Sequence, residues 1–491
     1  MLRRLLRETS IYSAGNVLGV LAGLISFPIL TRTLTLADYG LLSLINVTIT
    51  LLTGVAKLGI QHSVNRYYAE ADAPTAPGDA KPRLYATTVY GIATAGMVAA
   101  LLWGLVSLTV PLGWWGATAT HFALLIAASV VAVRSLESGL INLLRAQQRS
   151  GSYSIYSVAK KYVSLSLILV AVLSIAPRVD LILAATFIAE LGVVLSLFYY
   201  MFHRGGLPPA QVDLGLFKRM LAFGLPMVGY EIGGITMSIS NRYVLNHFAT
   251  QEAVGIYSAL HNIAEYSNSI LVLAFGQAVV PIYMKLWEQR GPAATSEFLS
   301  RALAVYLCAA GGLAMGLSAC GPALITLLAS EKFLVGADLI PWIITGMLVE
   351  GMIVIVAAGI FVRKNTTLML YLMVGGAMLN LTMNFALIPQ YGMKGAAIST
   401  LLTYVALATA AIRLGRAQLQ VSFSAAQFLR IVGSAVLAWW IASLISIENP
   451  FLEILARGSL GLSCYLASIA LVDRQLRDIG IEGFKSLERG N

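Results

Sequence analysis

The chain has 491 residues, of which 58% are hydrophobic and only 11% are charged. Soluble domains carry roughly 25% charged residues, so this composition excludes an ordinary soluble protein and indicates a membrane protein with many spans. The formal net charge of +10 needs its own explanation, because a basic balance also occurs in proteins that bind nucleic acid.

Apolar segments long enough to cross a bilayer follow one another along the whole chain. Their cores are residues 11–33, 39–60, 86–110, 119–144, 155–176, 181–202, 221–247, 255–280, 302–320, 338–361, 367–388, 395–414, 427–446 and 453–472. Residues 320–337 fit a short interfacial helix better than a span. We therefore expect an all-α polytopic membrane protein with about 14 transmembrane helices.

The distribution of Lys and Arg predicts the topology. With the N-terminus placed in the cytoplasm, 23 of these residues fall in inside segments and six at outside ends. Positive charge is enriched in cytoplasmic segments of membrane proteins. We therefore expect both termini in the cytoplasm, and this bias explains the net charge without nucleic acid.

The sequence also repeats itself. Thr35-Leu-Ala-Asp-Tyr-Gly-Leu-Leu-Ser43 recurs as Thr250-Gln-Glu-Ala-Val-Gly-Ile-Tyr-Ser258, and Arg145 aligns with Arg363 at a similar offset. Because each half holds an even number of spans, the repeats are parallel, as in several transporters. We expect an N-terminal six-helix lobe (1–202), a cytoplasmic linker (203–219), a C-terminal six-helix lobe (220–416), two additional C-terminal helices (427–472) and a cytoplasmic tail (473–491).

A polar face interrupts the segment 119–144. Arg134, Glu137 and Ser138 lie three and four positions apart, so they share one face of a helix. An arginine near mid-membrane costs about 2.5 to 3.5 kcal/mol. Such a face needs a water-filled cavity, a partner helix or an anionic ligand; a structural ion pair between two helices is the alternative.

The first half carries most of the intramembrane cations. These are Lys57, Arg134, Lys160 and Lys161, against the carboxylates Glu137 and Glu190. We predict that Arg134, Lys57 and one of Lys160 and Lys161 line a cavity that binds a diphosphate, because arginine holds phosphate oxygens in pairs. Glu137 would neutralise Arg134 in the absence of substrate. Alternatively, the lysines extend to the membrane surface.

The second half carries intramembrane carboxylates at Glu231, Glu265 and Glu350, with His261 on the face of Glu265. We predict coupling or gating roles for Glu137, Glu231, Glu265 and Glu350, with H⁺ or Na⁺ as the coupling ion and no other cofactor or metal. The alternatives are structural hydrogen-bonded carboxylates, packing contacts at Glu350 and Glu190, and binding of a drug cation.

Several loose motifs occur in a specific order. They are Thr35–Ser43, Leu58–Glu70, Ser240–Leu245, Val254–Ser258 and Leu387–Ser399. In these the chain resembles the bacterial polysaccharide flippases, the O-antigen or Wzx-type transporters of the multidrug/oligosaccharidyl-lipid/polysaccharide exporter superfamily. The resemblance implies two six-helix lobes that rock about a central cavity, and a fourteen-helix count is more similar to glycolipid flippases than to twelve-helix drug exporters.

The resemblance and the charges together predict a function. We expect a secondary transporter that flips a polyprenyl-diphosphate-linked oligosaccharide from the cytoplasmic to the outer leaflet of the bacterial inner membrane by alternating access. A flippase for a lipid-linked peptidoglycan precursor and a drug/cation antiporter are the alternatives. An enzyme is disfavoured, because the outer connections are short and no GxxxxGK[ST] or HExxH motif occurs. Expected partners are membrane lipid, a polysaccharide polymerase and assembly proteins, but no nucleic acid, and we expect a monomer.

Overall fold

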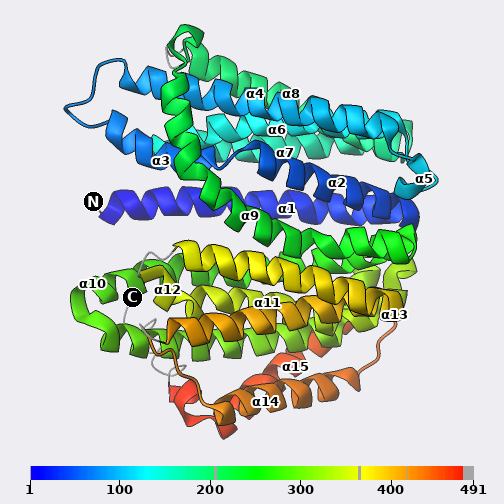
Figure 1. Ribbon diagram of the computed structural model, residues 1–491. Coiled ribbons are helices and arrows are strands. Elements are labelled where there is room, and N and C mark those ends of the chain that lie inside the picture. The colour runs from blue at the N-terminus through cyan, green and yellow to red at the C-terminus, as the bar shows by residue number, and fades with distance from the viewer. Residues whose placement is uncertain (1, 204–206, 363–365, 417–418, 479–491) are drawn as a thin grey trace. The chain divides into compact units, whose positions relative to one another are not determined.

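The computed structural model describes residues 2–203, 207–362, 366–416 and 419–478. The chain forms two compact units, Met1–Gly255 and Ile256–Asn491, each built from helices (Figure 1). The described residues contain no strand. Eleven of their helices are long and apolar enough to cross a membrane, or twelve when the bent α9 counts as one span. The chain is therefore a multi-pass membrane protein with an all-α fold, as the sequence predicts.

Unit 1 begins with a long helix and contains most of the candidate cations. Its helices are α1 (Leu2–Thr33), α2 (Leu36–Ala56), α3 (Ile60–Ala71), α4 (Ala80–Thr109), α5 (Leu112–Trp115), α6 (His121–Ala146), α7 (Ser150–Val170, extended by a π turn at Ala171–Ile175), α8 (Val179–His203), a 3-10 turn (Pro209–Gln211) and α9 (Leu214–Phe248). Helix α6 packs against both α4 and α8, and α7 packs against α1 and α8. Helix α6 therefore lies inside this unit, where its polar face meets other helices.

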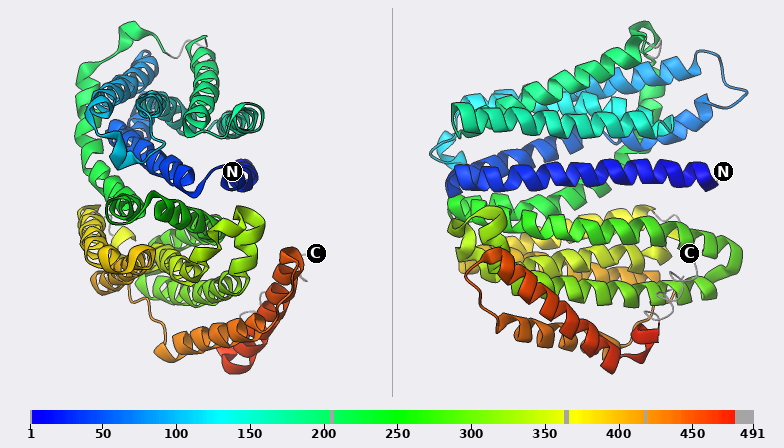
Figure 2. Two further views of the ribbon diagram at one scale, coloured as in Figure 1. Left: turned by 90° about the vertical axis from the view of Figure 1, so that its right-hand side faces the viewer. Right: turned by 180° about the vertical axis from the view of Figure 1, so that it is seen from behind.

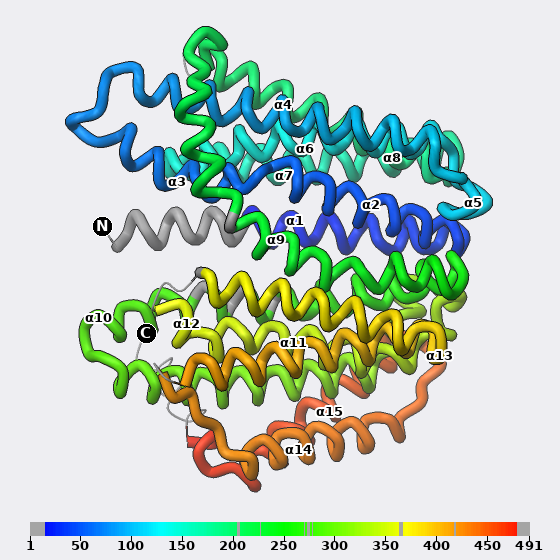
Figure 3. Tube along the Cα trace, in the orientation of Figure 1, coloured from blue at the N-terminus to red at the C-terminus, as the bar shows by residue number. Residues whose placement is uncertain are grey.

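Unit 2 continues from α10, whose first residues still belong to unit 1. Its elements are α10 (Gln251–Leu324), a π turn (Ile325–Ala329), a 3-10 helix (Glu331–Leu339), α11 (Ile340–Val356), α12 (Ala358–Val362), α13 (Thr366–Gly415), α14 (Ala425–Ser443) and α15 (Pro450–Val472). The elements labelled α10 and α13 each consist of two consecutive helices joined at a glycine with positive φ, which is Gly291 (76°) in α10 and Gly392 (55°) in α13. The chain doubles back within both (Figure 3). The fourteen predicted segments thus correspond to the long helices, and the 3-10 helix falls at the end of the predicted non-spanning region.

Helix α2 ends at Ala56, and α3 begins at Ile60, the last residue of the second predicted span (39–60). Leu58 and Gly59 both have positive φ (51° and 68°) at this break, a conformation that only glycine adopts without strain. A Cβ atom on Gly59 would collide with the carbonyl oxygen of Gly224 in α9, and the Ser63 hydroxyl donates to the Met220 carbonyl at 2.6 Å. Helix α3 is therefore fixed against the first part of α9.

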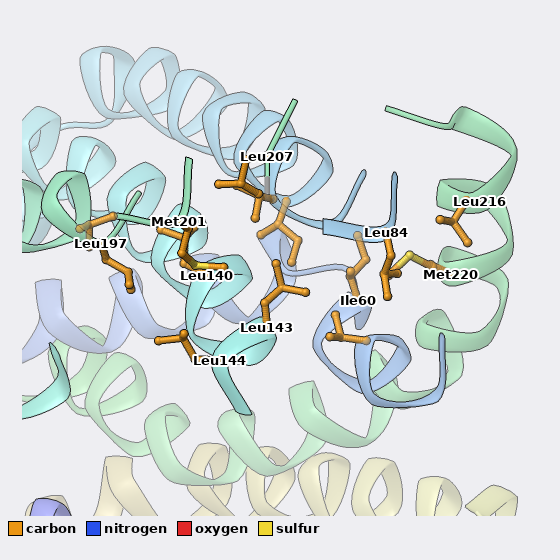
Figure 4. Packing of buried hydrophobic residues seen from close by; sticks show 14 of the residues in the cluster. Ile60, Leu84, Leu140, Leu143, Leu144, Leu197, Met201, Leu207, Leu216 and Met220 are labelled. Carbon is orange, nitrogen blue, oxygen red and sulfur yellow. The ribbon is translucent and has the colours of Figure 1, made fainter. Parts of the chain in front are cut away.

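Apolar side chains fill the space between these helices at one end of unit 1 (Figure 4). Ile60 and Val64 of α3 lie in one cluster with Leu140 and Leu143 of α6 and Met220 of α9. Each of these five side chains is fully or almost fully buried. Burying such side chains contributes roughly 1.5 to 3 kcal/mol each relative to water, although lipid reduces that difference for a membrane protein.

The sequence repeat has a direct structural counterpart. Thr35 begins α2 and accepts a hydrogen bond from the Asp38 amide at 3.0 Å, while Thr250 begins α10 and accepts one from the Ala253 amide at 3.2 Å. The repeated glycines, Gly40 and Gly255, pack against each other's helix. The predicted lobe limits at residues 203–219 stay a prediction; in the structure α9 belongs to unit 1, because it packs on α2, α3 and α4.

The last two helices form a hairpin within unit 2, with α14 and α15 side by side in both views of Figure 2. The Tyr465 hydroxyl of α15 donates to the Cys308 carbonyl of α10 at 2.7 Å. Arg457 of α15 donates to the carbonyl oxygens of Ala319 at 2.9 Å and Ile445 at 2.8 Å. These bonds attach the two additional helices to α10. Residues 479–491 of the predicted cytoplasmic tail lie outside the described residues.

Candidate functional site: a charged quartet in unit 1

Arg134 of α6 forms a two-pronged ion pair inside unit 1. Its Nε donates to Glu190 Oε2 and its Nη2 to Glu190 Oε1, each at 2.9 Å. Glu190 projects from α8 and is only 6% exposed, whereas Arg134 is 26% exposed. A planar guanidinium fits a carboxylate in this parallel arrangement, which gives strong and directional hydrogen bonds.

Lys160 of α7 pairs with the other charged residue of α6. Its Nζ lies 2.7 Å from Glu137 Oε1 and 2.8 Å from Oε2. Lys160 is 21% exposed and Glu137 is 17% exposed. Arg134, Glu137, Lys160 and Glu190 form what we call the charged quartet, because Glu137 also attracts Arg134 and Lys160 also attracts Glu190. The quartet joins α6, α7 and α8.

The sequence predicts Glu137 as the carboxylate that neutralises Arg134, and this pairing is wrong. Glu190 binds Arg134, whereas Glu137 binds Lys160. The i,i+3 spacing of Arg134 and Glu137 permits contact on a helix surface. Glu190 of α8 forms the ion pair because both of its carboxylate oxygens can lie along one edge of the guanidinium. Arg134 forms an ion pair between two helices, and its predicted contact with a substrate stays a prediction.

Lys161 differs from its neighbour Lys160. Consecutive helical positions point about 100° apart, and Lys161 is exposed. It lies along α1 at Gly19, where an added Cβ would collide with the Lys161 ammonium group. Among the side chains that the structure describes, no carboxylate pairs with Lys161. It is thus an uncompensated cation next to a compensated one.

Lys57 belongs to a different group of residues. It caps the C-terminus of α2 and lies near Glu231 of α9. Glu231 Oε2 accepts a hydrogen bond from Gln61 Nε2 and lies 3.6 Å from His62 Nε2. Lys57, Gln61, His62 and Glu231 form the α3–α9 cluster. Gln61 and His62 were not among the predicted site residues, although both belong to the motif Leu58–Glu70.

Two predicted carboxylates lie close together in unit 2. His261 Nδ1 is 3.7 Å from Glu265 Oε2, as their i,i+4 spacing predicts, and Glu265 is 63% exposed. Glu350 of α11 hydrogen-bonds the Tyr404 side chain of α13 and lies near Glu265. The sequence offered no signal for Tyr404, because nothing in its spacing relates it to Glu350.

The family of the chain follows from its sequence. The sequence model of a family described as polysaccharide biosynthesis protein matches residues 5–287, more than half of the chain. The chain belongs to this family. No curated protein matches it.

Solved structures share its fold. A structure of the lipid II flippase MurJ in an inward closed conformation is 13% identical, with a TM-score of 0.73, and the match covers 95% of this chain and 99% of that one. An inward-facing multidrug resistance MATE family transporter of the MOP superfamily is also 13% identical, with a TM-score of 0.62, over 81% of this chain and 94% of that one. A MATE structure in complex with MaL6 is 14% identical, with a TM-score of 0.56, over 84% and 94%. Identities this low concern the fold alone.

Proposed function

We propose that this polysaccharide biosynthesis family member is a secondary transporter that flips a polyprenyl-diphosphate-linked oligosaccharide to the outer leaflet of the bacterial inner membrane. The observation that carries the proposal is the charged quartet with the adjacent Lys161, inside a unit of apolar helices. Charged groups within a membrane span are costly and mark transport pathways more often than packing contacts. The family description and the flippase-like fold support the same proposal.

The candidate cations differ in whether a carboxylate already lies beside them. We assign diphosphate contact first to Lys161, which has no carboxylate partner among the described side chains. Arg134, Lys160 and Lys57 each already lie beside a carboxylate, which lowers their attraction for an anion. We therefore assign these three residues a secondary part in the site.

The carboxylates supply candidates for gating or ion coupling. Glu137 lies in the quartet and Glu231 in the α3–α9 cluster, whereas Glu265 and Glu350 lie together in unit 2. Protonation or a bound Na⁺ at one of them would change the local charge that the substrate meets. We propose that the transporter acts as a monomer beside a polysaccharide polymerase and assembly proteins, with both termini in the cytoplasm.

Reconstitution tests the proposal against its rivals. The purified chain in proteoliposomes should move a polyprenyl-diphosphate-linked oligosaccharide between leaflets, measured by the accessibility of its sugar to an external glycan-modifying enzyme. Lys161→Gln should slow this movement, whereas Arg301→Gln, which removes an exposed ion pair with Glu297, should leave it unchanged. Movement of a fluorescent drug cation instead would replace the proposal by a drug/cation antiporter, and exclusive movement of a lipid-linked peptidoglycan precursor would change the substrate.

A further inference from the structure

The charged quartet presents donors and acceptors together, rather than a bare positive surface. Arg134, Lys160 and Glu137 are each partly exposed, while Glu190 is almost fully buried. Two positive and two negative groups balance within the quartet. A ligand that reaches it therefore meets N–H donors and carboxylate acceptors side by side, with no net charge.

A diphosphate fits this arrangement poorly. Glu190 already occupies the Nε–Nη2 edge of Arg134 and neutralises its charge, so an anion meets only the outer N–H groups of a compensated cation. Drawing Arg134 away from Glu190 would leave that carboxylate buried without its partner, which is strongly unfavourable. Lys160 faces the same obstacle, because both Glu137 oxygens lie within 2.8 Å of its Nζ.

Sugar hydroxyl groups fit it well. A hydroxyl both donates and accepts, an arginine has five N–H donors, and a carboxylate has about four acceptor sites. Glu190 occupies only two N–H groups of Arg134, and Lys160 occupies only part of the acceptor capacity of Glu137. Hydroxyls can use the remaining sites while both ion pairs stay intact.

We infer that the charged quartet binds hydroxyl groups of the sugar next to the diphosphate, and that Lys161 contacts the diphosphate itself. Lys161 follows Lys160 on α7 and points about 100° away from it, yet the two ammonium groups are close enough to repel each other. A diphosphate and the sugar attached to it are likewise neighbouring groups in a lipid-linked glycan. This inference rests on the proposed function and names the part of the substrate that each group contacts.

Binding measurements separate the two roles. The full chain in nanodiscs is titrated with undecaprenyl diphosphate and with undecaprenyl diphosphate carrying one N-acetylglucosamine, and bound lipid is quantified by native mass spectrometry. One or two hydrogen bonds to charged groups should make the sugar-bearing lipid bind about tenfold tighter or more. The double variant Glu137→Leu/Lys160→Met, which replaces a pair by apolar residues, should lose this difference and keep its affinity for the bare diphosphate lipid.

Lys161→Gln should instead weaken both lipids by the same factor. Arg301→Gln is the matched control and should alter neither affinity. If Glu137→Leu/Lys160→Met does not fold, as judged by its thermal melt, Arg134→Met/Glu190→Leu provides the same test on the other pair.

Three results would overturn the inference. Equal binding of the two lipids by the wild type would exclude a contact with the sugar, and equal weakening of both lipids by the quartet variants would make the quartet a diphosphate site. Either result would leave the proposed function intact. Failure of the wild type to bind either lipid, together with transport of a drug cation, would remove the inference and the proposed function alike.

Discussion

Gly40 of α2 and Gly255 of α10 are the positions where one added methyl group should be least tolerated. A Cβ atom on Gly40 would lie closer to the Gln251 carbonyl oxygen than the 3.0 Å that real Cβ atoms keep, and a Cβ on Gly255 would meet the Leu36 carbonyl oxygen in the same way. Both obstacles are backbone atoms, which cannot rotate away as a flexible side chain can. Gly40→Ala or Gly255→Ala must therefore push the two helices apart.

The size of the effect follows from two opposing contributions. Restoring an ordinary carbon–oxygen separation of about 3.5 Å requires the helices to move by about 1.4 Å. Overpacking of this kind costs about 1 to 3 kcal/mol, whereas alanine in place of glycine in a helix contributes about 0.5 to 1 kcal/mol of stability. The net expectation is a loss of about 1 to 2 kcal/mol for each variant.

Gly192 of α8 provides the matched control, because no atom lies within 4 Å of its added Cβ. Gly192→Ala should stabilise the protein by about 0.5 kcal/mol, since only the helix preference of alanine acts there. The free energy of unfolding in detergent, followed by tryptophan fluorescence against denaturant, measures all three. A Gly40→Ala protein that is as stable as Gly192→Ala would refute the close contact of the two repeated segments.

Four further predictions follow from named contacts. Arg134→Met and Glu190→Leu should each lower the free energy of unfolding by about 3 kcal/mol, because a single substitution leaves a buried charge unpaired. The double variant should recover most of this lost stability. Additive losses in the double-mutant cycle would contradict the pairing. Asn449→Ala should cost about 1 kcal/mol, because Asn449 accepts hydrogen bonds from the Phe451 and Leu452 amides at 3.0 and 3.2 Å, whereas Asn449→Asp should retain the cap; equal stability of all three proteins would argue against it. The Leu216 amide donates a hydrogen bond to Asp213 and, with Arg83 nearby, lowers the pKa of this carboxyl. The wild type should therefore be more stable than Asp213→Asn, fully so above the unfolded pKa of about 3.9, and this advantage should disappear as pH falls through the lower folded pKa. A stability advantage independent of pH would count against this bond. Glu265→Gln should abolish the pH or sodium dependence of transport if Glu265 carries the coupling ion, and an unchanged dependence would remove it from that role.

The fold was largely predictable because its determinants are local. A run of about 20 apolar residues predicts a span whatever it packs against, and Thr35 and Thr250 signal helix starts through their side-chain oxygens. The break at Leu58 and Gly59 was not predictable in the same way, because it accompanies the close approach of Gly224, a residue far away in the sequence.

The candidate site was predictable in its members but not in its pairings. Arg134 and Lys160 stand out because charge is rare in apolar segments. The partner of each depends on how α6, α7 and α8 rotate about their axes, which the sequence does not specify. Glu190 therefore looked like a minor residue, although it holds Arg134 with both oxygens.

Pairing also suits a transporter that must release what it binds. Three unpaired cations in a low-dielectric site would attract a diphosphate strongly, and strong retention slows release on the far side of the membrane. With Glu137 and Glu190 in place, the quartet and Lys161 together carry a single net positive charge. The two ion pairs also hold α6, α7 and α8 in one arrangement before substrate arrives, so binding requires little reordering of these side chains. For the proposed diphosphate-linked substrate, a preformed neutral quartet beside Lys161, which lacks a carboxylate partner among the described side chains, would give moderate affinity. Such affinity would allow both capture on one side of the membrane and release on the other.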